Sequence, residues 1–234
     1  MNIIENVFKS SVGKKFVMAV TGFALFGFVL GHLAGNLQIF LGPEAINRYG
    51  HFLQSNPEII WPARIILLLC VGLHIWSAIQ ISLENKAARP EAYAAYQPVG
   101  SSYASRTMLM SGIIILVFVI YHLLHYTVLV QAINLTGRNF AVFEDPEKRH
   151  DIFKMMVVGF HNGWVSGFYI LGMALLCLHL SHGASSMFQS IGWKNQAYRP
   201  CLDKAAGWLA GLIFLGYVSI PLAILLGYGK EALK

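Results

Sequence analysis

The sequence predicts an all-α integral membrane protein with five transmembrane helices, and two observations lead to this fold class. Of the 234 residues, 56% are hydrophobic and only 12% are charged, whereas about a quarter of the residues in a soluble domain are charged. The charged residues also cluster, which leaves five long stretches without Asp, Glu, Lys or Arg: 16–43, 65–83, 107–137, 155–193 and 205–229. Because about 20 residues cross the hydrocarbon core of a bilayer, each stretch can hold one transmembrane helix.

Within these stretches we expect the spans to cover about 16–41, 61–83, 107–130, 164–186 and 205–228. The stretch 155–193 is too long for one simple span, so its ends should lie in the membrane interfaces. We interpret residues 1–234 as a single transmembrane domain. The first span is expected to remain in the mature protein, because its apolar stretch is longer than that of a cleavable signal peptide.

The basic residues flank the expected spans and form no continuous run, so the net charge of +6 gives no reason to expect nucleic-acid binding. Lys9, Lys14 and Lys15 precede the first span, and only Glu5 opposes them. Since positive residues flanking the first helix usually stay in the cytoplasm, we expect the N-terminus there. The odd-numbered spans then run outward and the even-numbered spans inward.

Each of the first four spans contains a histidine about two-thirds of the way along: His32, His74, His122 and His179. Ionisable residues are costly inside a membrane and usually serve a function there. Neutral imidazole is a standard ligand of haem iron. Four such ligands on four helices would hold two bis-histidine haems b inside the bundle. There is no C-x-x-C-H motif for covalent attachment, and the pattern indicates an electron-carrying membrane protein.

The depth of each histidine predicts which two share an iron. Since successive spans run in opposite directions, His32 and His122 should lie in the outer half of the membrane, and His74 and His179 in the inner half. At 1.5 Å per residue, the two levels are about 10 Å apart. The trans ligands of one haem lie at one depth, so the predicted pairs are His32 with His122 and His74 with His179. One haem then lies near each face.

Two further histidines complicate the choice of ligands. His125 and His182 follow His122 and His179 by three residues, so the members of each pair share roughly one helix face. From spacing alone, either member could be the ligand, or both could bind one metal. Three other histidines are expected to be surface residues: His51, His150 and His161.

Five sequence pieces follow one another along the chain: Gly31-His32-Leu33-Ala34-Gly35-Asn36, Gly50-His51-Phe52-Leu53, Gly72-Leu73-His74, Tyr121-His122-Leu123 and His179-Leu180-Ser181-His182-Gly183. Through them the chain resembles, over essentially its whole length, the cytochrome b membrane-anchor subunit of succinate dehydrogenase and fumarate reductase (complex II), in its single-chain, five-helix, di-haem form. No piece is specific alone, but five in this order are. The resemblance implies that His122 and His179, rather than His125 and His182, are ligands together with His32 and His74.

The resemblance further implies a complex in the bacterial cytoplasmic (inner) membrane. A flavoprotein subunit would oxidise succinate, as in the tricarboxylic acid cycle, or reduce fumarate, and an iron–sulfur subunit would relay electrons. This chain would anchor both subunits and connect them to quinone, which in such relatives is mostly menaquinone. Its inner segments 84–106 and 199–204 would meet the iron–sulfur subunit. Some relatives carry a Glu on a proposed proton path where this chain has Cys177.

Polar residues near the two expected haems are candidates for further contacts. Propionates need cationic or hydrogen-bonding partners, and the candidates on the inner side are Lys15, Arg106 and Lys204. The candidates for hydrogen bonds to a quinone near the outer haem are Gln38, His51 and Glu58.

Two other functions fit parts of the pattern. The chain could be the haem b subunit of another quinone-linked dehydrogenase, such as a hydrogenase or a formate dehydrogenase. It could also be a transporter whose histidines bind a transition metal or relay protons. Such transporters usually have acidic residues or broken helices near the midplane, and no Asp or Glu lies in the five apolar stretches.

Overall fold

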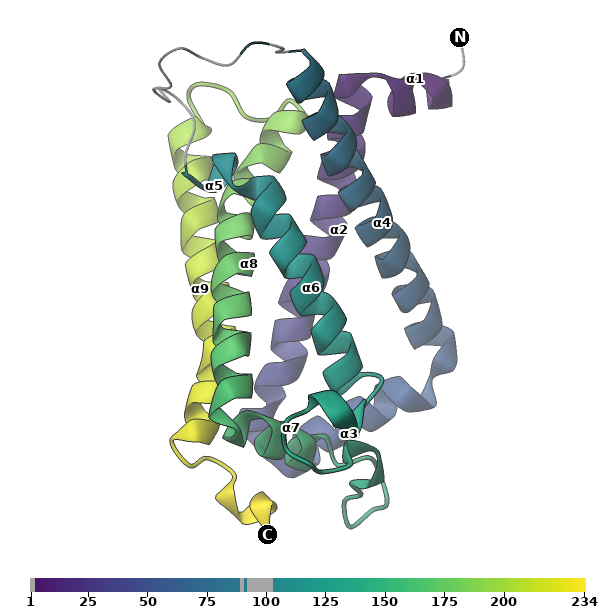
Figure 1. Ribbon diagram of the computed structural model, residues 1–234, viewed down its shortest axis with the longest axis vertical. Helices are drawn as coiled ribbons and strands as arrows, with labels where there is room; N and C mark the ends of the chain where they lie inside the picture. Colours follow the sequence, from purple (N-terminus) through teal and green to yellow (C-terminus); the bar gives the residue numbers. More distant parts are fainter. Residues whose placement is uncertain (1–2, 89–90, 92–102) are drawn as a thin grey trace. The chain divides into compact units, whose positions relative to one another are not determined.

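The computed structural model describes residues 3–88, 91 and 103–234, and 82% of these residues are helical (Figure 1). The α-helices are α1 (Ile3–Lys9), α2 (Ser11–Leu37), α3 (Pro43–Ser55), α4 (Pro57–Ala87), α5 (Tyr103–Arg106), α6 (Met108–Tyr126), α7 (Ile152–His161), α8 (Gly163–Ser190) and α9 (Arg199–Leu225). The short 3-10 helices are η1 (Gln38–Leu41), η2 (Gln131–Ile133), η3 (Phe140–Val142) and η4 (Lys230–Leu233). Within the described ranges there is no β-strand.

Five of the described helices are long and apolar enough to cross a membrane: α2 with η1, α4, α6, α8 and α9 (Figure 1). Large apolar side chains such as Leu68, Leu178 and Leu215 are exposed on their surfaces. Apolar surface in contact with lipid costs nothing, which is why a membrane helix can expose it. The predictions of an all-α fold and of five helices able to span a membrane are confirmed, although α4 and α8 are longer than their expected spans and α6 ends at Tyr126.

The segment expected to be an outer loop between the first two spans contains a helix, α3. Gly42 precedes it with a φ of 100°, and Pro43 is its first residue. The fixed φ of proline suits the first helical position, where no backbone N–H donor is needed. Ile46, Asn47 and Gly50 are buried. The sequence analysis missed α3 because it is amphipathic and too short to span a membrane.

The long charge-free stretch 155–193 is divided at Asn162 into the short helix α7 and the long helix α8. The side-chain oxygen of Asn162 accepts hydrogen bonds from the backbone N–H groups of Trp164 (3.0 Å) and Val165 (3.3 Å). These bonds satisfy donors that have no partner within the first turn of a helix. The expectation that this stretch exceeds one span is therefore confirmed at its N-terminal end.

The chain forms two compact units, and α2, α4, α6, α8 and α9 each contribute to both. Unit 1 comprises residues 1–28, 64–113 and 178–210. Unit 2 comprises residues 29–63, 114–177 and 211–234. The interpretation of residues 1–234 as one domain stays a prediction.

In unit 1, polar side chains join the ends of neighbouring helices. Lys14, whose side chain is buried, forms an ion pair with Glu84, which also accepts a hydrogen bond from Ser11 (2.8 Å). This contact connects α2 to α4. Asp203 of α9 accepts hydrogen bonds from Ser185 of α8 and from Lys194 (2.6 Å). Two of the three lysines that led us to expect a cytoplasmic N-terminus are thus paired with a carboxylate, because Lys9 also forms an ion pair with Glu5.

Unit 2 contains the largest group of buried apolar side chains, and the short helices α3 and α7 contribute to it. Phe153, Val157 and Phe160 of α7 are buried in this cluster with Ile39 and Ile46. The amphipathic helices therefore have an apolar face to bury, which stabilises them although they are too short to be stable alone.

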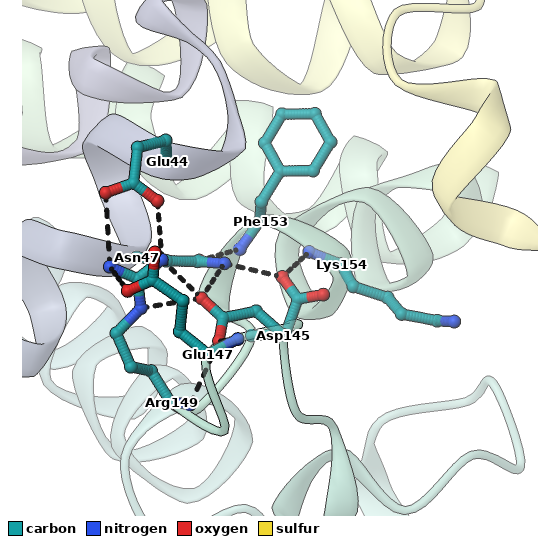
Figure 2. Close-up of polar contacts among 8 residues, drawn as sticks. Glu44, Asn47, Asp145, Glu147, Arg149, Phe153 and Lys154 are labelled. Atoms are coloured by element: carbon teal, nitrogen blue, oxygen red, sulfur yellow. Dashed lines mark hydrogen bonds and ion pairs between the residues drawn. The ribbon is translucent and has the colours of Figure 1, made fainter.

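A cluster of charged residues lies beside this core and connects α3 to the segment before α7 (Figure 2). Arg149 donates two hydrogen bonds to Glu44 (2.6 and 3.2 Å) and one to Asp145 (2.7 Å). The hydrogen bond from Arg149 lowers the pKa of Glu44. Burial alone would raise the pKa of Asp145, but the hydrogen bonds and charge of Arg149 outweigh it, and the pKa is lowered.

Asn47 of α3 completes this connection from the inside. Its side-chain oxygen accepts from the backbone N–H of Phe153 (3.0 Å), and its amide nitrogen donates to Asp151 (3.0 Å). Asp151 in turn accepts from the backbone N–H of Lys154 (2.9 Å). Figure 2 shows these side chains around the start of α7. The N-terminus of α7 is thus capped by its own chain and by α3.

Candidate functional site

Unit 2 brings together two of the four histidines singled out by the sequence. His32 on α2 and His122 on α6 have their ring centres 5.7 Å apart, with an angle of 80° between the ring planes. The ring of Phe118, one turn before His122, lies nearly parallel to the His122 ring at 6.2 Å. Tyr217 of α9 lies 6.4 Å from the His32 ring. The two histidines predicted to share one depth are therefore neighbours.

Unit 1 brings together the other two. His74 on α4 and His179 on α8 have their ring centres 6.4 Å apart. A glycine lies beside each ring: a Cβ atom at Gly22 would lie 3.3 Å from Cε1 of His74, and one at Gly112 would lie 3.7 Å from Cε1 of His179. The missing side chain at Gly22 lets the imidazole lie close against α2.

Both ring distances fit a pair of histidines that bind one haem. Two imidazoles on opposite sides of one metal ion hold their ring centres about 6 Å apart, since each nitrogen–metal bond is about 2 Å and each ring centre lies about 1 Å further away. A porphyrin would supply the other four ligands, so two histidines per iron would be sufficient. Among the described residues there is no group of three or more His, Cys, Asp or Glu side chains that could hold a metal ion.

The contacts of His74 determine which of its nitrogens can bind a metal. Its Nδ1 lies 3.2 Å from the carbonyl oxygen of Met18, which can only accept a hydrogen bond. It also lies 3.3 Å from the hydroxyl oxygen of Thr21, and that hydroxyl already donates to the carbonyl of Val17 (2.8 Å). Nδ1 must therefore carry the proton, and Nε2 has a free lone pair. This is the tautomer that metal binding through Nε2 requires.

The same arrangement recurs at His179. Its Nδ1 lies 3.1 Å from the hydroxyl oxygen of Ser111 on α6, and this hydroxyl donates to the carbonyl oxygen of Met108 (3.0 Å). The serine is therefore the acceptor, and Nδ1 of His179 is the donor. At His122, Nδ1 lies 3.3 Å from the hydroxyl oxygen of Tyr169 on α8. Three of the four candidate ligands thus have a hydroxyl from another helix at Nδ1, which leaves Nε2 available.

The two additional histidines have different surroundings. His125 is completely buried, and its ring is stacked against Tyr126 with centres 4.0 Å apart. His182 has its Nε2 3.0 Å from the hydroxyl of Ser186 on the same helix. The ring contacts described above pair His122 with His32 and His179 with His74, in agreement with the choice that the resemblance implies.

The remaining candidate residues are spread over the two units. All three propionate candidates belong to unit 1 and are exposed: Lys15, Arg106 and Lys204. All three quinone candidates belong to unit 2, together with His32 and His122: Gln38, His51 and Glu58. His51 and Glu58 are exposed, and Gln38 is half-buried. Most of the segment 84–106, expected to face a partner subunit, lies outside the described residues.

The sequence analysis missed the hydroxyl groups that contact the histidines. Thr21, Ser111 and Tyr169 each lie within an apolar span, and a polar side chain in such a place often bonds to another helix. That signal was present in the sequence. It could not tell which histidine each hydroxyl contacts, because this depends on how the helices pack.

Comparison with models of protein families, with curated proteins and with solved structures gave no match for this chain. The resemblance to the complex II cytochromes therefore depends on the five sequence pieces alone.

Proposed function

We propose that this protein is the di-haem cytochrome b membrane anchor of a succinate:quinone oxidoreductase. The observation that carries the proposal is the pairing of four membrane histidines: His32 with His122, and His74 with His179, each pair from two different helices at a separation suited to one iron. The free Nε2 of His74 and of His179 supports it further. A bound haem would supply a one-electron carrier at each pair.

The residues of the chain would hold these carriers in a low-dielectric environment. The imidazoles of His74, His122 and His179 each have a hydroxyl partner on another helix, which would orient the ring for binding through Nε2. Apolar surroundings exclude water and favour non-covalent retention of a porphyrin. Lys15, Arg106 and Lys204 are the proposed partners of propionates in unit 1.

We further propose that the chain connects an iron–sulfur subunit and a flavoprotein subunit to membrane quinone, and that menaquinone is the physiological form. Gln38, His51 and Glu58 share unit 2 with the His32–His122 pair, and their side chains can donate to or accept from quinone carbonyls. The proposed location is the bacterial cytoplasmic membrane with the N-terminus in the cytoplasm.

The test is to purify the tagged chain from its own membranes with whatever subunits accompany it. We expect a reduced-minus-oxidised spectrum of haem b, a partner with covalently bound flavin, and rapid haem reduction on addition of succinate. Reoxidation by a menaquinone analogue should follow. Reduction by hydrogen or formate but not by succinate would instead assign the chain to another dehydrogenase. A purified protein without a haem spectrum would contradict every haem-based function and favour transport.

A further inference from the structure

The hydroxyl of Tyr169 lies between two histidines of α6. Its oxygen is 3.3 Å from Nδ1 of His122 and 3.1 Å from Nδ1 of His125. Tyr169 is 6% exposed and His125 is 0% exposed. All three groups belong to unit 2. They form a buried chain of two hydrogen bonds with the tyrosine in the middle.

The number of available protons fixes the direction of both bonds. A tyrosine hydroxyl has one hydrogen to donate, and it can accept a hydrogen bond as well. If His122 binds a metal through Nε2, its Nδ1 is protonated and must donate to the tyrosine. The hydroxyl of Tyr169 then donates to Nδ1 of His125. His125 consequently carries its own proton on Nε2, a buried atom with no hydrogen-bond partner among the described residues.

The surroundings of His125 hold its ring in the orientation that this chain of bonds requires. The ring is stacked against Tyr126, with ring centres 4.0 Å apart, and also contacts Phe140, whose ring centre is 5.7 Å away. A buried histidine nitrogen without a partner costs free energy, and a histidine used only for packing would gain by replacement with an apolar residue. The presence of a histidine at this position needs an explanation, and the bond from Tyr169 to Nδ1 provides one.

The other histidine pair shows why such a residue is needed. At His74 and His179, the hydroxyls of Thr21 and Ser111 give their hydrogens to carbonyl oxygens of their own helices, which forces each hydroxyl to accept from the imidazole. The two described partners of the Tyr169 hydroxyl are imidazole nitrogens. His125 therefore accepts the hydroxyl hydrogen of Tyr169, as backbone carbonyls accept those of the hydroxyls beside His74 and His179.

We propose that His125 is a positioning residue for the haem ligand His122 and acts on it through Tyr169. By accepting the tyrosine hydrogen, it leaves the hydroxyl oxygen to accept from Nδ1 of His122, which fixes the tautomer of that ligand. The inference rests on the proposed function, because it concerns a histidine that binds haem. Such outer hydrogen bonds make a ligand more basic, and a more basic ligand stabilises the ferric state relative to the ferrous state.

Three variants of the complete complex test this inference: His125→Leu, His125→Asn and Tyr169→Phe. Leucine fills space but cannot accept a hydrogen bond, whereas the smaller asparagine can present its amide oxygen close to the position of Nδ1. A role in packing would therefore favour the leucine variant, and a role as acceptor would favour the asparagine variant. His182→Leu, the equivalent change on α8, is the matched control.

The readouts are the haem content and the midpoint potential of each haem. All variants should keep both haems. In His125→Leu and Tyr169→Phe the potential of the haem at His32–His122 should rise. If the preference for the ferric over the ferrous state falls tenfold, the rise is about 59 mV, because the couple transfers one electron. His125→Asn should restore most of the wild-type value. The His182→Leu protein should keep the wild-type potential at the His32–His122 haem.

The inference is overturned if Tyr169→Phe leaves the potential unchanged, or if the asparagine and leucine variants behave alike. Tyr169→Phe alters only one oxygen, so an unchanged potential in this variant overturns the inference even if a His125 variant fails to fold. A wild-type complex without haem would instead overturn the proposed function, and the two failures are thus distinguishable.

Discussion

At the scale of single residues, the two histidines in each closely spaced pair have different neighbours. His122 and His179 each have the ring of a histidine from another helix within 6.4 Å. The ring of His125 is stacked against Tyr126 and Phe140 instead, and Nε2 of His182 contacts Ser186. These contacts support the proposal that the first member of each pair is the ligand.

This assignment predicts the haem content of four alanine variants. His122→Ala and His179→Ala should each reduce the content from about two haems per chain to about one, because each removes an axial ligand. His125→Ala and His182→Ala should keep both haems. Pyridine-haemochrome analysis of the purified proteins measures the ratio. Loss of a haem from His182→Ala together with its retention in His179→Ala would reverse the assignment in α8.

At this scale the sequence predicted the histidines but not their partners. The regular depth of four histidines in four apolar stretches was visible in the sequence, and it predicted the pairs that the structure brings together. The hydroxyls of Thr21 and Ser111 were not predicted, since nothing local distinguishes them from the other small polar residues that join membrane helices.

At the scale of elements, the contact between α3 and α7 depends on one buried amide. Asn47 is 1% exposed and bonds both to the backbone of Phe153 and to Asp151. Asn47→Ala should cost about 1–3 kcal/mol, because a buried N–H and a carboxylate lose their partner. In detergent the apparent Tm should fall by about 2–4 °C per kcal/mol.

Asn139→Ala is the matched control for this variant. Asn139 is exposed and accepts a hydrogen bond from the backbone N–H of Ala141, so its removal should change the Tm much less. Equal Tm values for the two variants would show that the amide of Asn47 does not hold α3 against α7.

The charged cluster around Arg149 predicts how this contact responds to acid. The pKa values of Glu44 and Asp145 are lowered in the folded protein. Their contribution to stability is therefore present above the pKa of unfolded carboxyls, about 4, and is lost as the pH falls through the lower folded values. Arg149→Gln should remove this part of the acid sensitivity, as measured by the apparent Tm across this pH range.

A second component of the acid response should come from His150, whose pKa is lowered by burial. For a base with a lowered pKa, the stabilising neutral form is lost as the pH falls below the unfolded value, about 6.5. His150→Gln should remove this higher-pH component and leave the one near pH 4 in place. If Arg149→Gln abolished the higher-pH component instead, His150 could not be the source of that component.

The sequence predicted the long elements well and the short ones poorly. Charge-free stretches of about 20 residues identify α2, α4, α6, α8 and α9, because the bilayer sets their length. Helices α3 and α7 fall below that length. They are stabilised by burial against each other and by the polar contacts of Asn47 and Asp151, which connect positions about a hundred residues apart and leave no local signal.

At the scale of the whole molecule, the proposed orientation predicts the order of electron transfer. His74 and His179 are expected in the inner half of the membrane, next to the iron–sulfur subunit. Succinate should therefore still reduce their haem in His32→Ala. In His74→Ala, rapid reduction of the haem at His32–His122 should be blocked. Stopped-flow spectra of both complexes measure this, and fast reduction in His74→Ala would contradict the depth assignment and the expected orientation of the spans.

The most direct test of the central claim is the haem content of the wild-type chain and of its four ligand variants: His32→Ala, His74→Ala, His122→Ala and His179→Ala. The wild type should contain about two haems b per polypeptide and each variant about one. The haem that remains should have the same spectrum and potential in His32→Ala and His122→Ala, and the other haem should remain in His74→Ala and His179→Ala. A wild-type ratio near one or zero would contradict the claim that these four histidines hold two haems. The predicted pairs would be contradicted if His32→Ala and His122→Ala kept different haems, or if His74→Ala and His179→Ala did.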